Sequence, residues 1–236
     1  MTRGLYAAAA AMLADLQRQD VAANNLANLD TPGFKRDVSF QRALAEMLAT
    51  DASSAPLGSR LTGTTVDVRQ GDFVRTDAPL DIALDGDGFF VVASPAGEFL
   101  TRNGRFTLNR DGELVTAAGL KVLGDKGPIR LSGGRFEVGE AGRLFVDGQF
   151  VDTLRIVAPA DPSELVKVGD SLMAAPSTQP AGRLRVLQGF YERSNVVAIE
   201  ELTGMIRGLR GFEANAKALT SQDESLQRLI RAAAGR

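Results

Sequence analysis

The two ends of this chain carry apolar residues at helical spacing, whereas its middle does not. In residues 3–28 apolar side chains recur at alternating steps of four and three, and the same pattern returns in residues 195–232. Such steps average 3.5 residues, which is the repeat of helices that pack along a shared seam. The sequence therefore predicts a long helix at each terminus, and each helix needs another helix to cover its apolar row.

The predicted assembly seam uses the larger side chains of both rows. Its members are Leu5, Met12, Leu16, Leu26, Ile199, Leu202, Ile206, Leu209, Phe212 and Leu219. A hairpin of two helices from one chain would also explain this periodicity. The N-terminal row, however, is rich in alanine, which buries little area at roughly 25 cal/mol per Å². We therefore expect helices of several copies to share the packing.

The residues between the helices read as short strands separated by turns. Turn sequences with Gly and Asp recur about every ten residues from residue 85 to residue 148, and β-type runs such as residues 89–92 lie between them. This spacing is typical of an antiparallel body built from hairpins. The predicted fold class is α+β, mainly β, in which discontinuous terminal α-helices form a coiled-coil-type layer around an inserted antiparallel β body.

These patterns predict where the segments of the chain begin and end. The segments are an N-terminal helix (residues 1–28), a connector (29–68), a β-rich domain (69–192) and a C-terminal helix (193–236). Within the connector, residues 40–48 suggest a short amphipathic helix. Ser194 or Asn195 is the expected N-cap of the C-terminal helix, because a side-chain oxygen can accept from the first free N–H groups.

The composition excludes several kinds of active site. The chain has no His and no Cys, so it cannot build a histidine-dependent triad, a cysteine nucleophile or a thiolate zinc site. Its 27 basic and 29 acidic residues give a net charge of −2 without a basic cluster, so we expect no nucleic-acid partner. No apolar run reaches the roughly 20 residues that span a bilayer, so we expect a chain that does not span membranes. The Ala-rich residues 5–14 resemble a signal peptide, but the helical row continues beyond them, so no cleavable signal is expected.

Several acidic and glycine-rich sequences could carry chemistry, and each has a plainer explanation. Residues 85–88 and 109–112 resemble the start of calcium loops, but neither has a Glu at loop position twelve, which favours hairpin turns with positive φ. Four aspartates could supply a carboxylate pair for glycoside chemistry or simply form a polar face: Asp77, Asp81, Asp85 and Asp87. The glycines in residues 85–88 lack the following Lys and Ser or Thr of a phosphate loop. We predict no catalytic, cofactor-binding or metal-binding residue.

Four separated motifs resemble the signatures of the bacterial flagellar rod and hook axial proteins. They occupy residues 23–36, 87–92, 101–116 and 187–196. The residues that carry the signature are Asn24, Asn25, Asn28, Gly33, Phe34, Gly88, Phe89, Gly189, Ser194 and Asn195. The motifs occur in the family's order, and the match covers nearly the whole chain at these four separated places, so the resemblance is specific.

The resemblance implies a structural, non-catalytic axial subunit of the flagellar basal-body rod, which polymerises through its terminal helices and transmits torque for motility. The implied partners are copies of the chain itself, neighbouring rod and hook proteins, and the flagellar type III export apparatus, with export lacking a cleavable signal peptide. In the family, the termini are disordered in the monomer and form coiled-coil helices in the assembled tube. Residues 123–129 and 210–213 resemble the proximal-rod subgroup more than the distal-rod subgroup.

The alternative is a secreted β-rich protein that binds or hydrolyses carbohydrate. That function would require two carboxylates at the separation found in glycosidases. It would also require them to face a concave pocket.

Overall fold

The computed structural model describes residues 2–42, 60–169 and 171–234. They form two compact units. Of the described residues, the helical unit comprises 2–27, 37–42, 60–65 and 197–234, and the β unit comprises 28–36, 66–169 and 171–196. The terminal helices pack against each other and most other elements are antiparallel strands, so the predicted fold class, α+β and mainly β, is confirmed.

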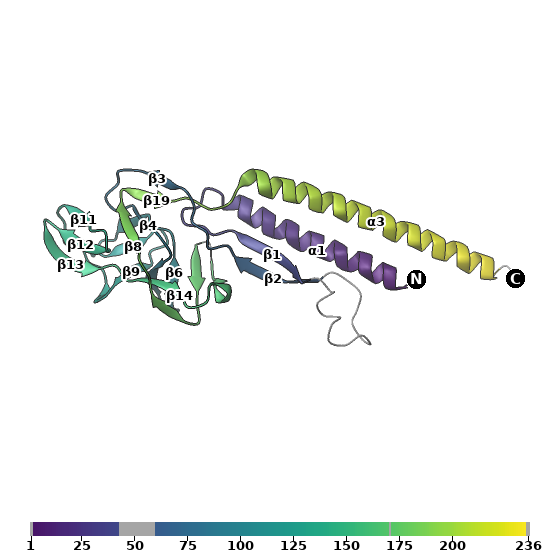
Figure 1. Cartoon of the computed structure of the whole chain (residues 1–236), viewed down its shortest axis with the longest axis horizontal. Helices are drawn as coiled ribbons and strands as arrows, with labels where there is room; N and C mark the ends of the chain where they lie inside the picture. Colours follow the sequence, from purple (N-terminus) through teal and green to yellow (C-terminus); the bar gives the residue numbers. More distant parts are fainter. Residues whose placement is uncertain (1, 43–59, 170, 235–236) are drawn as a thin grey trace. The chain divides into compact units, whose positions relative to one another are not determined.

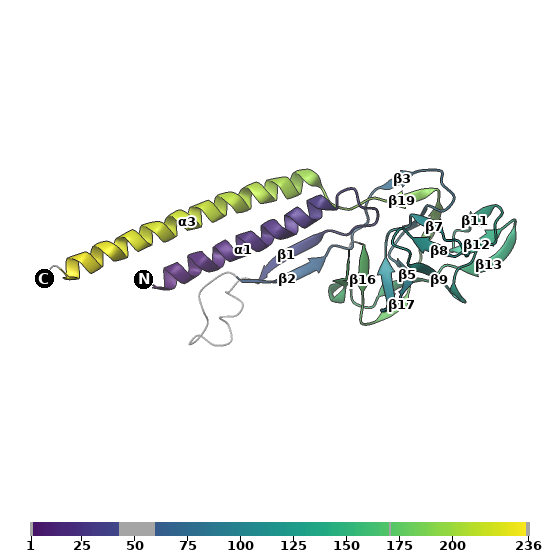
Figure 2. The ribbon, with the colours of Figure 1, turned by 180° about the vertical axis from the view of Figure 1, so that it is seen from behind.

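The helical unit contains two long helices and a two-stranded sheet. Helix α1 spans Thr2–Ala27 and α3 spans Ala198–Ala234, and the two lie side by side in both ribbon views (Figures 1 and 2). Strand β1 (Asp37–Arg42) pairs with β2 (Arg60–Val66), and β1 contacts α1. Helices of 26 and 37 residues draw most of their stability from packing and not from intrinsic propensity.

The short helix expected in residues 40–48 does not begin as predicted, because Phe40 lies in strand β1. Val38 and Phe40 alternate with the polar residues around them, and this period of two is the pattern of a strand with one apolar face. The remainder of the expected helix, residues 43–48, lies outside the described residues.

The start of α3 also differs from the expectation. The backbone N–H groups of Glu200 and Glu201 donate to the carbonyl oxygen of Val197 at 3.0 and 3.2 Å, so the first helical turn begins at Val197. Ser194 Oγ accepts instead from the N–H of Val196 at 3.3 Å. The side chain of Asn195 is bonded to other segments of the β unit, which leaves it unable to cap the helix.

One large sheet and three smaller ones make up the β unit. The large sheet has ten strands, with a main order of β15-β16-β6-β5-β9-β8-β7, and β10, β14 and β17 pair off this path. Its strands are β5 (Phe89–Ser94), β6 (Gly97–Thr101), β7 (Phe106–Leu108), β8 (Leu114–Thr116), β9 (Lys121–Gly124), β10 (Gly127–Pro128), β14 (Ile156–Pro159), β15 (Val166–Lys167), β16 (Leu172–Ala174) and β17 (Thr178–Pro180). The smaller sheets pair β11 (Phe136–Val138), β12 (Arg143–Val146) and β13 (Gln149–Thr153), then β18 (Arg185–Gln188) with β4 (Ile82–Asp85), and β19 (Phe190–Glu192) with β3 (Phe73–Arg75). A 3-10 turn, η1, spans Pro162–Glu164.

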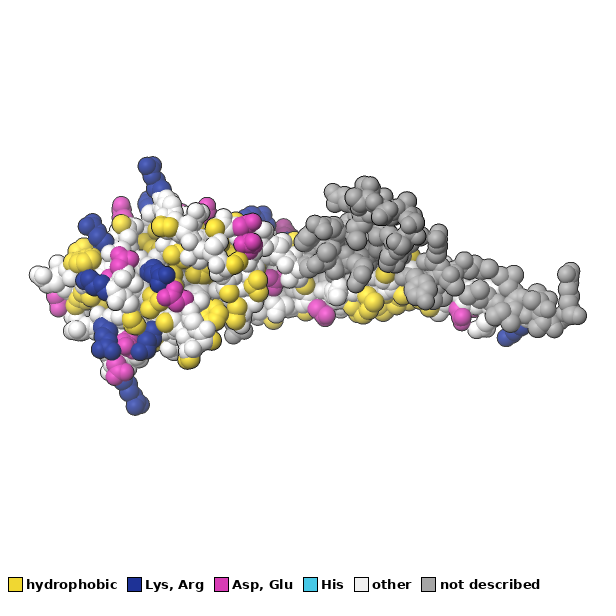
Figure 3. Space-filling view, turned by 90° about the horizontal axis from the view of Figure 1, so that it is seen from below, with side chains coloured by type: hydrophobic (Ala, Val, Ile, Leu, Met, Phe, Trp, Pro, Cys, Tyr) yellow, Lys and Arg dark blue, Asp and Glu magenta, His cyan; other side chains and the backbone are white. Residues whose placement is uncertain are grey.

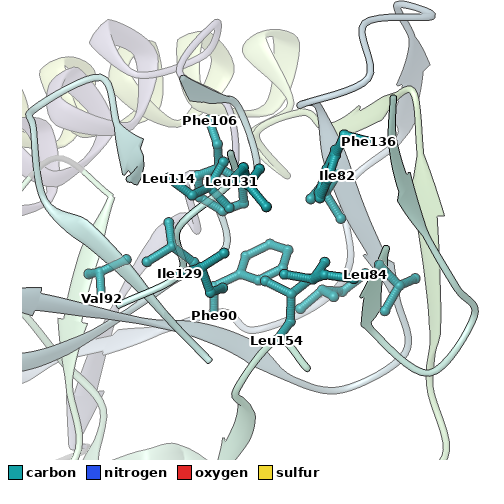
Figure 4. Packing of buried hydrophobic residues seen from close by; sticks show 13 residues of the cluster. Ile82, Leu84, Phe90, Val92, Phe106, Leu114, Ile129, Leu131, Phe136 and Leu154 are labelled. Atoms are coloured by element: carbon teal, nitrogen blue, oxygen red, sulfur yellow. The ribbon is translucent and has the colours of Figure 1, made fainter. Parts of the chain in front are cut away.

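Strand β5 lies between two apolar clusters. Successive side chains of a strand point to opposite faces. Phe90 and Val92 therefore belong to one cluster (Figure 4). In this cluster the rings of Phe90 and Phe106 pack edge to face, with 5.1 Å between their centroids. Phe89 and Val91 join the other. Both faces of β5 are buried, which agrees with the continuous apolar run at its start. Full burial of each such side chain stabilises the fold by about 1.5–3 kcal/mol relative to leaving it exposed.

Of the two sequences that resemble calcium loops, residues 109–112 form the hairpin turn between β7 and β8, as predicted. Residues 85–88 join β4 to β5, which belong to different sheets and do not pair, so the hairpin predicted there is wrong. Gly86 has a φ of 122° and Gly112 a φ of 73°. Asn109 Oδ1 accepts from the N–H groups of Asp111 and Glu113 at 3.0 and 2.8 Å, so the loop's own backbone occupies this side chain.

Candidate assembly surfaces and a buried ionic cluster

The contact between α1 and α3 is made by small and polar residues. On α1, Ala14 and Ala22 are buried together with the polar residues Asp15 and Asn25. On α3, the Asn215 amide nitrogen lies 3.4 Å from Asp15 Oδ2. Small side chains let two helices approach closely, and the large apolar residues on this side of α3, Phe212 and Leu219, are only half-buried.

Asn25, one of the signature residues, connects three elements of the helical unit. Its Nδ2 donates to the Asp37 carbonyl oxygen at 2.9 Å and to Glu201 Oε1 at 3.2 Å. Its Oδ1 accepts from the Asp37 N–H at 2.8 Å. The side chain is 1% exposed, so its hydrogen bonds hold α1, β1 and α3 together out of contact with water.

The first half of the predicted row on α3 points away from α1. Ile199, Leu202, Ile206 and Leu209 are between 47% and 77% exposed. At about 100° of rotation per residue, Ile199 and Ile206 lie on the side of α3 opposite Gly208, whose backbone approaches Asp15. These large apolar side chains are left uncovered within the described part of the chain.

The three-residue shift after Leu209 brings the second half of the row to a different face. By the same rotation, Phe212 and Leu219 lie on the side of α3 that faces α1, and both are half-buried. On α1, Met12 and Leu26 are half-buried and Leu16 is 44% exposed, while the Leu5 side chain lies outside the described residues. The structure therefore does not bring the ten seam residues into one contact.

A buried ionic cluster lies inside the β unit. It consists of Lys35, Arg102 and Glu192, which are 1%, 4% and 1% exposed. Lys35 Nζ donates to Glu192 Oε1 at 2.6 Å, and Arg102 Nε donates to Glu192 Oε2 at 2.5 Å. Burial lowers the pKa of the Lys35 ammonium below its ordinary value, and the neighbouring Glu192 carboxylate opposes this shift.

Backbone groups satisfy the remaining polar atoms of this cluster. Arg102 Nη2 donates to the carbonyl oxygens of Leu84 and Gly86 at 2.6 and 2.8 Å, and Nη1 donates to that of Gly88. The N–H of Gly71 donates to Glu192 Oε1 at 2.9 Å. A buried charge is tolerated only with such partners, so the cluster fixes the turn before β5 against the segment that precedes α3.

Signature residues surround the cluster. Gly33 has a φ of 68°, and its N–H donates to the Glu192 carbonyl oxygen at 2.8 Å. The Phe34 ring is buried, with Lys167 Nζ 3.8 Å from its centroid. Asn195 Oδ1 accepts from the Arg36 N–H at 2.7 Å, which joins the segment after α1 to the segment before α3.

Other signature residues have backbone or packing roles. A Cβ on Gly88 would lie 2.9 Å from Ile156 Cγ2, and Gly189 has a φ of 79°. Phe89 is in the second apolar cluster. Asn28 Oδ1 accepts from Thr31 Oγ1 at 3.1 Å in the turn after α1. Asn24 lies on an exposed position of α1.

Sequence reasoning missed the ionic cluster although each member lies inside a recognised motif. Lys35 follows Phe34, Arg102 precedes Asn103-Gly104, and Glu192 follows Tyr191. A charged residue placed directly beside buried aromatic and glycine positions was the available signal. It does not say which opposite charge each residue meets.

The four candidate carboxylates do not form a pair. Asp81 accepts from Thr76 Oγ1 at 2.7 Å, Asp85 binds Arg185 at 2.7 Å and Asp77 binds Arg75 at 2.7 Å. None of these aspartates is among the described residues that line a groove of about 1060 Å³ in the β unit. Asp87 lines a smaller pocket of about 270 Å³, and the described lining of that pocket contains no second carboxylate. This arrangement does not match the geometry required by the carbohydrate-hydrolysing alternative.

Acidic and basic side chains are mixed on the surface of the β unit. They are interspersed over the face seen in Figure 3, without a continuous basic area. In the described ranges, no helix is long and apolar enough to cross a membrane.

Three family models match successive parts of the chain. Residues 5–35 match "Flagella basal body rod protein", residues 83–166 match "Flagellar hook protein FlgE/F/G D1 domain", and residues 187–232 match "Flagellar basal body rod FlgEFG protein C-terminal". Together they include both signature-bearing ends and the β region.

Curated relatives align over nearly their whole length. The flagellar basal-body rod protein FlgF of Rhizobium meliloti is 35% identical, covering 100% of this chain and 99% of the relative. FlgG of Bacillus subtilis is 33% identical over 98% of both chains, and FlgF of Salmonella typhimurium is 32% identical over 95% of this chain and 96% of the relative. The chain therefore belongs to the FlgE/F/G family of flagellar basal-body proteins, in which it is a structural component of the rod and not an enzyme.

Proposed function

We propose that this chain assembles into the rod through the apolar faces of α1 and α3 that their mutual contact leaves exposed. The observation that supports this proposal is the exposed row Ile199, Leu202, Ile206 and Leu209. Each such side chain gains about 1.5–3 kcal/mol when it is fully buried, which a single chain with this α1·α3 contact does not obtain.

The remaining members of the predicted seam belong to the same two rows, although Phe212 and Leu219 lie on the side of α3 that faces α1 and not on its exposed face. Leu5, Met12, Leu16 and Leu26 belong to the row on α1, and Phe212 and Leu219 continue the row on α3 after the shift. Residues 1–28 and 193–236 would then form the rod core, residues 29–68 the connector and residues 69–192 an outer β-rich domain. Torque would be transmitted through the packed helices.

The proposed partners are further copies of this chain and neighbouring rod and hook proteins. A head-to-tail contact between unlike surfaces that does not close on itself produces a helical assembly, which suits a shaft. The chain would reach the rod through the flagellar type III export apparatus, and its motifs favour a proximal position. Localising the tagged protein in purified basal bodies by electron microscopy tests this position.

Ile206→Asp tests the apolar row. It places a charge where a neighbouring helix is proposed to pack, so the variant should fold and be exported, yet fail to enter the rod and fail to restore swimming to a strain that lacks this protein. Arg207→Asp places the same carboxylate on an exposed position of α3 about 100° around the helix from Ile206, outside the row, and should restore swimming. Normal swimming with Ile206→Asp would refute the proposed surface.

A further inference from the structure

A carboxylate is buried in the contact between α1 and α3. Asp15 is 5% exposed although it lies on a helix whose other buried positions include alanines. Its carboxylate accepts from the Arg18 guanidinium of the same helix and lies 3.4 Å from the Asn215 Nδ2 of α3. Removing a carboxylate from water is costly unless donors are placed for it, so this position is not a neutral filler of the helix contact.

Gly211 provides the space that the Asp15 carboxylate occupies. A Cβ at Gly211 would lie 3.2 Å from Asp15 Oδ2, which is tighter than ordinary contact. A Cβ at Gly208 would lie 4.0 Å from the Asp15 carbonyl oxygen. By contrast, a Cβ at Gly204 would meet nothing within 4 Å. The need for glycine is therefore specific to the place where the carboxylate faces α3.

The sequence of α3 offers this combination in one register. A shift of one heptad toward the N-terminus would place Gly204 and Gly208 opposite Asp15, which supplies space but no amide donor. A shift of one heptad toward the C-terminus would place Ala218 where Gly211 stands, so a methyl group would fill the space. A single polar residue in a helix contact is known to specify register and partner at a cost in stability.

We infer that Asp15 determines the pairing specificity of the two helices. It holds α1 against α3 of the same chain in one register and thereby leaves the apolar rows to a second copy of the chain. This inference rests on the proposed function. Asp15 is a positioning residue and lies outside the proposed assembly surface.

A size exchange between Asp15 and Gly211 tests the inference in cells. Gly211→Leu fills the space of the carboxylate and should reduce swimming at least tenfold in a strain that lacks this protein. Asp15→Ala combined with Gly211→Leu removes the clash and should recover at least half of the wild-type swimming rate. Asp15→Asn keeps an acceptor for Asn215 and should swim like the wild type, whereas Asp15→Leu should not.

A second leucine variant distinguishes a specific contact between Asp15 and Gly211 from a general effect on the stability of the helices. Gly204→Leu is the matched control, and Asp15→Ala should not improve swimming when combined with it. If Asp15→Ala rescues both leucine variants equally, or rescues neither, the inference is overturned. The Ile206→Asp variant is measured in the same assay. If Ile206→Asp blocks swimming but the combined Asp15→Ala and Gly211→Leu variant does not recover, only the inference about Asp15 is wrong. If the Ile206→Asp variant swims normally, the proposed assembly surface itself is wrong. Immunoblots of each variant confirm equal protein levels.

Discussion

Glu192 joins several segments of the β unit that are distant in the sequence. Its carboxylate meets Lys35 and Arg102, and its carbonyl oxygen accepts from Gly33. Three buried charges are present, two positive and one negative. The cluster is stable because each charge has close partners, and removal of the single anion would leave two cations in the interior.

We predict that Glu192→Gln destabilises the β unit by about 3–5 kcal/mol, because it removes one member of a buried ion pair and keeps its shape. Urea denaturation of the full chain, followed by circular dichroism, measures the change. The matched control is Glu98→Gln, which breaks the solvent-exposed pair with Arg155 and should cost about 0–1 kcal/mol. Equal effects of the two substitutions would contradict a special role for Glu192.

Glu113 is a second residue whose charge matters to the β unit. It is buried and meets Lys121 at 2.9 Å, Asn109 at 2.9 Å and Arg130 at 3.0 Å. The hydrogen bond from Lys121, followed by that from Asn109, lowers the pKa of the Glu113 carboxyl to about 2. A pKa below the unfolded value means that the ionised form stabilises the fold.

The stability that Glu113 contributes should be present above its unfolded pKa of about 4.3 and lost as the pH falls toward 2. The Tm difference between the wild type and Glu113→Gln should therefore be largest near pH 6 and shrink steadily below pH 4. Thermal melts at a series of pH values test this. Glu137→Gln, at an exposed pair with Arg135, should show little difference at any pH. A Tm difference for Glu113→Gln that does not change with pH would contradict the assignment.

At the scale of single elements, the turn after α1 has a backbone that only glycine fits. Gly33 has a φ of 68°, and a Cβ there would collide with the backbone of Arg102 and Asn103. Both conditions act at the same residue. The turn that ends the N-terminal signature is therefore fitted against the turn between β6 and β7.

Gly33→Ala should destabilise the β unit by more than the strain of positive φ alone. Gly133 is a matched control, because its φ of 69° is nearly the same and a Cβ there would meet nothing within 4 Å. We expect Gly133→Ala to cost about 1–2 kcal/mol and Gly33→Ala clearly more. Urea midpoints of the two variants decide this, and equal midpoints would show that the backbone contact is unimportant.

Helix α3 shows how one helix can serve two kinds of contact. Its side toward α1 presents Gly211 and Asn215, whereas Ile199 and Ile206 lie on the opposite side. A continuous heptad would have kept all apolar residues on one side. The three-residue shift after Leu209 divides the row instead, so that α1 covers only part of it.

At the scale of the whole molecule, the two units differ in how far they bury their large apolar residues. The β unit buries two apolar clusters of its own, one on each face of β5. The helical unit uses small and polar residues for its helix contact and leaves large apolar side chains of α3 exposed. The need for partners therefore resides in the helical unit, in agreement with membership in a family of rod subunits.

Local sequence determined the types of structure in this protein. Period 3.5 predicted the two helices, turn residues predicted hairpins such as that between β7 and β8, and the apolar run of residues 89–92 predicted the strand that the structure has at Phe89–Ser94. These features depend on neighbours within a few residues, so they can be read along the chain. The strand at Phe40 was missed because the prediction followed the wider spacing to Leu44 and not the alternation with Val38.

Only the tertiary structure decided which polar residues meet and which side of each helix is covered. Glu192 lies 157 positions from Lys35 and 90 from Arg102, and no local pattern links them. In the same way, the periodicity of α3 showed that an apolar row exists but not that Asp15, Gly211 and Asn215 would occupy the contact with α1. Periodicity is a property of neighbouring residues, whereas ion pairing and helix facing depend on packing between segments that the chain brings together only when it folds.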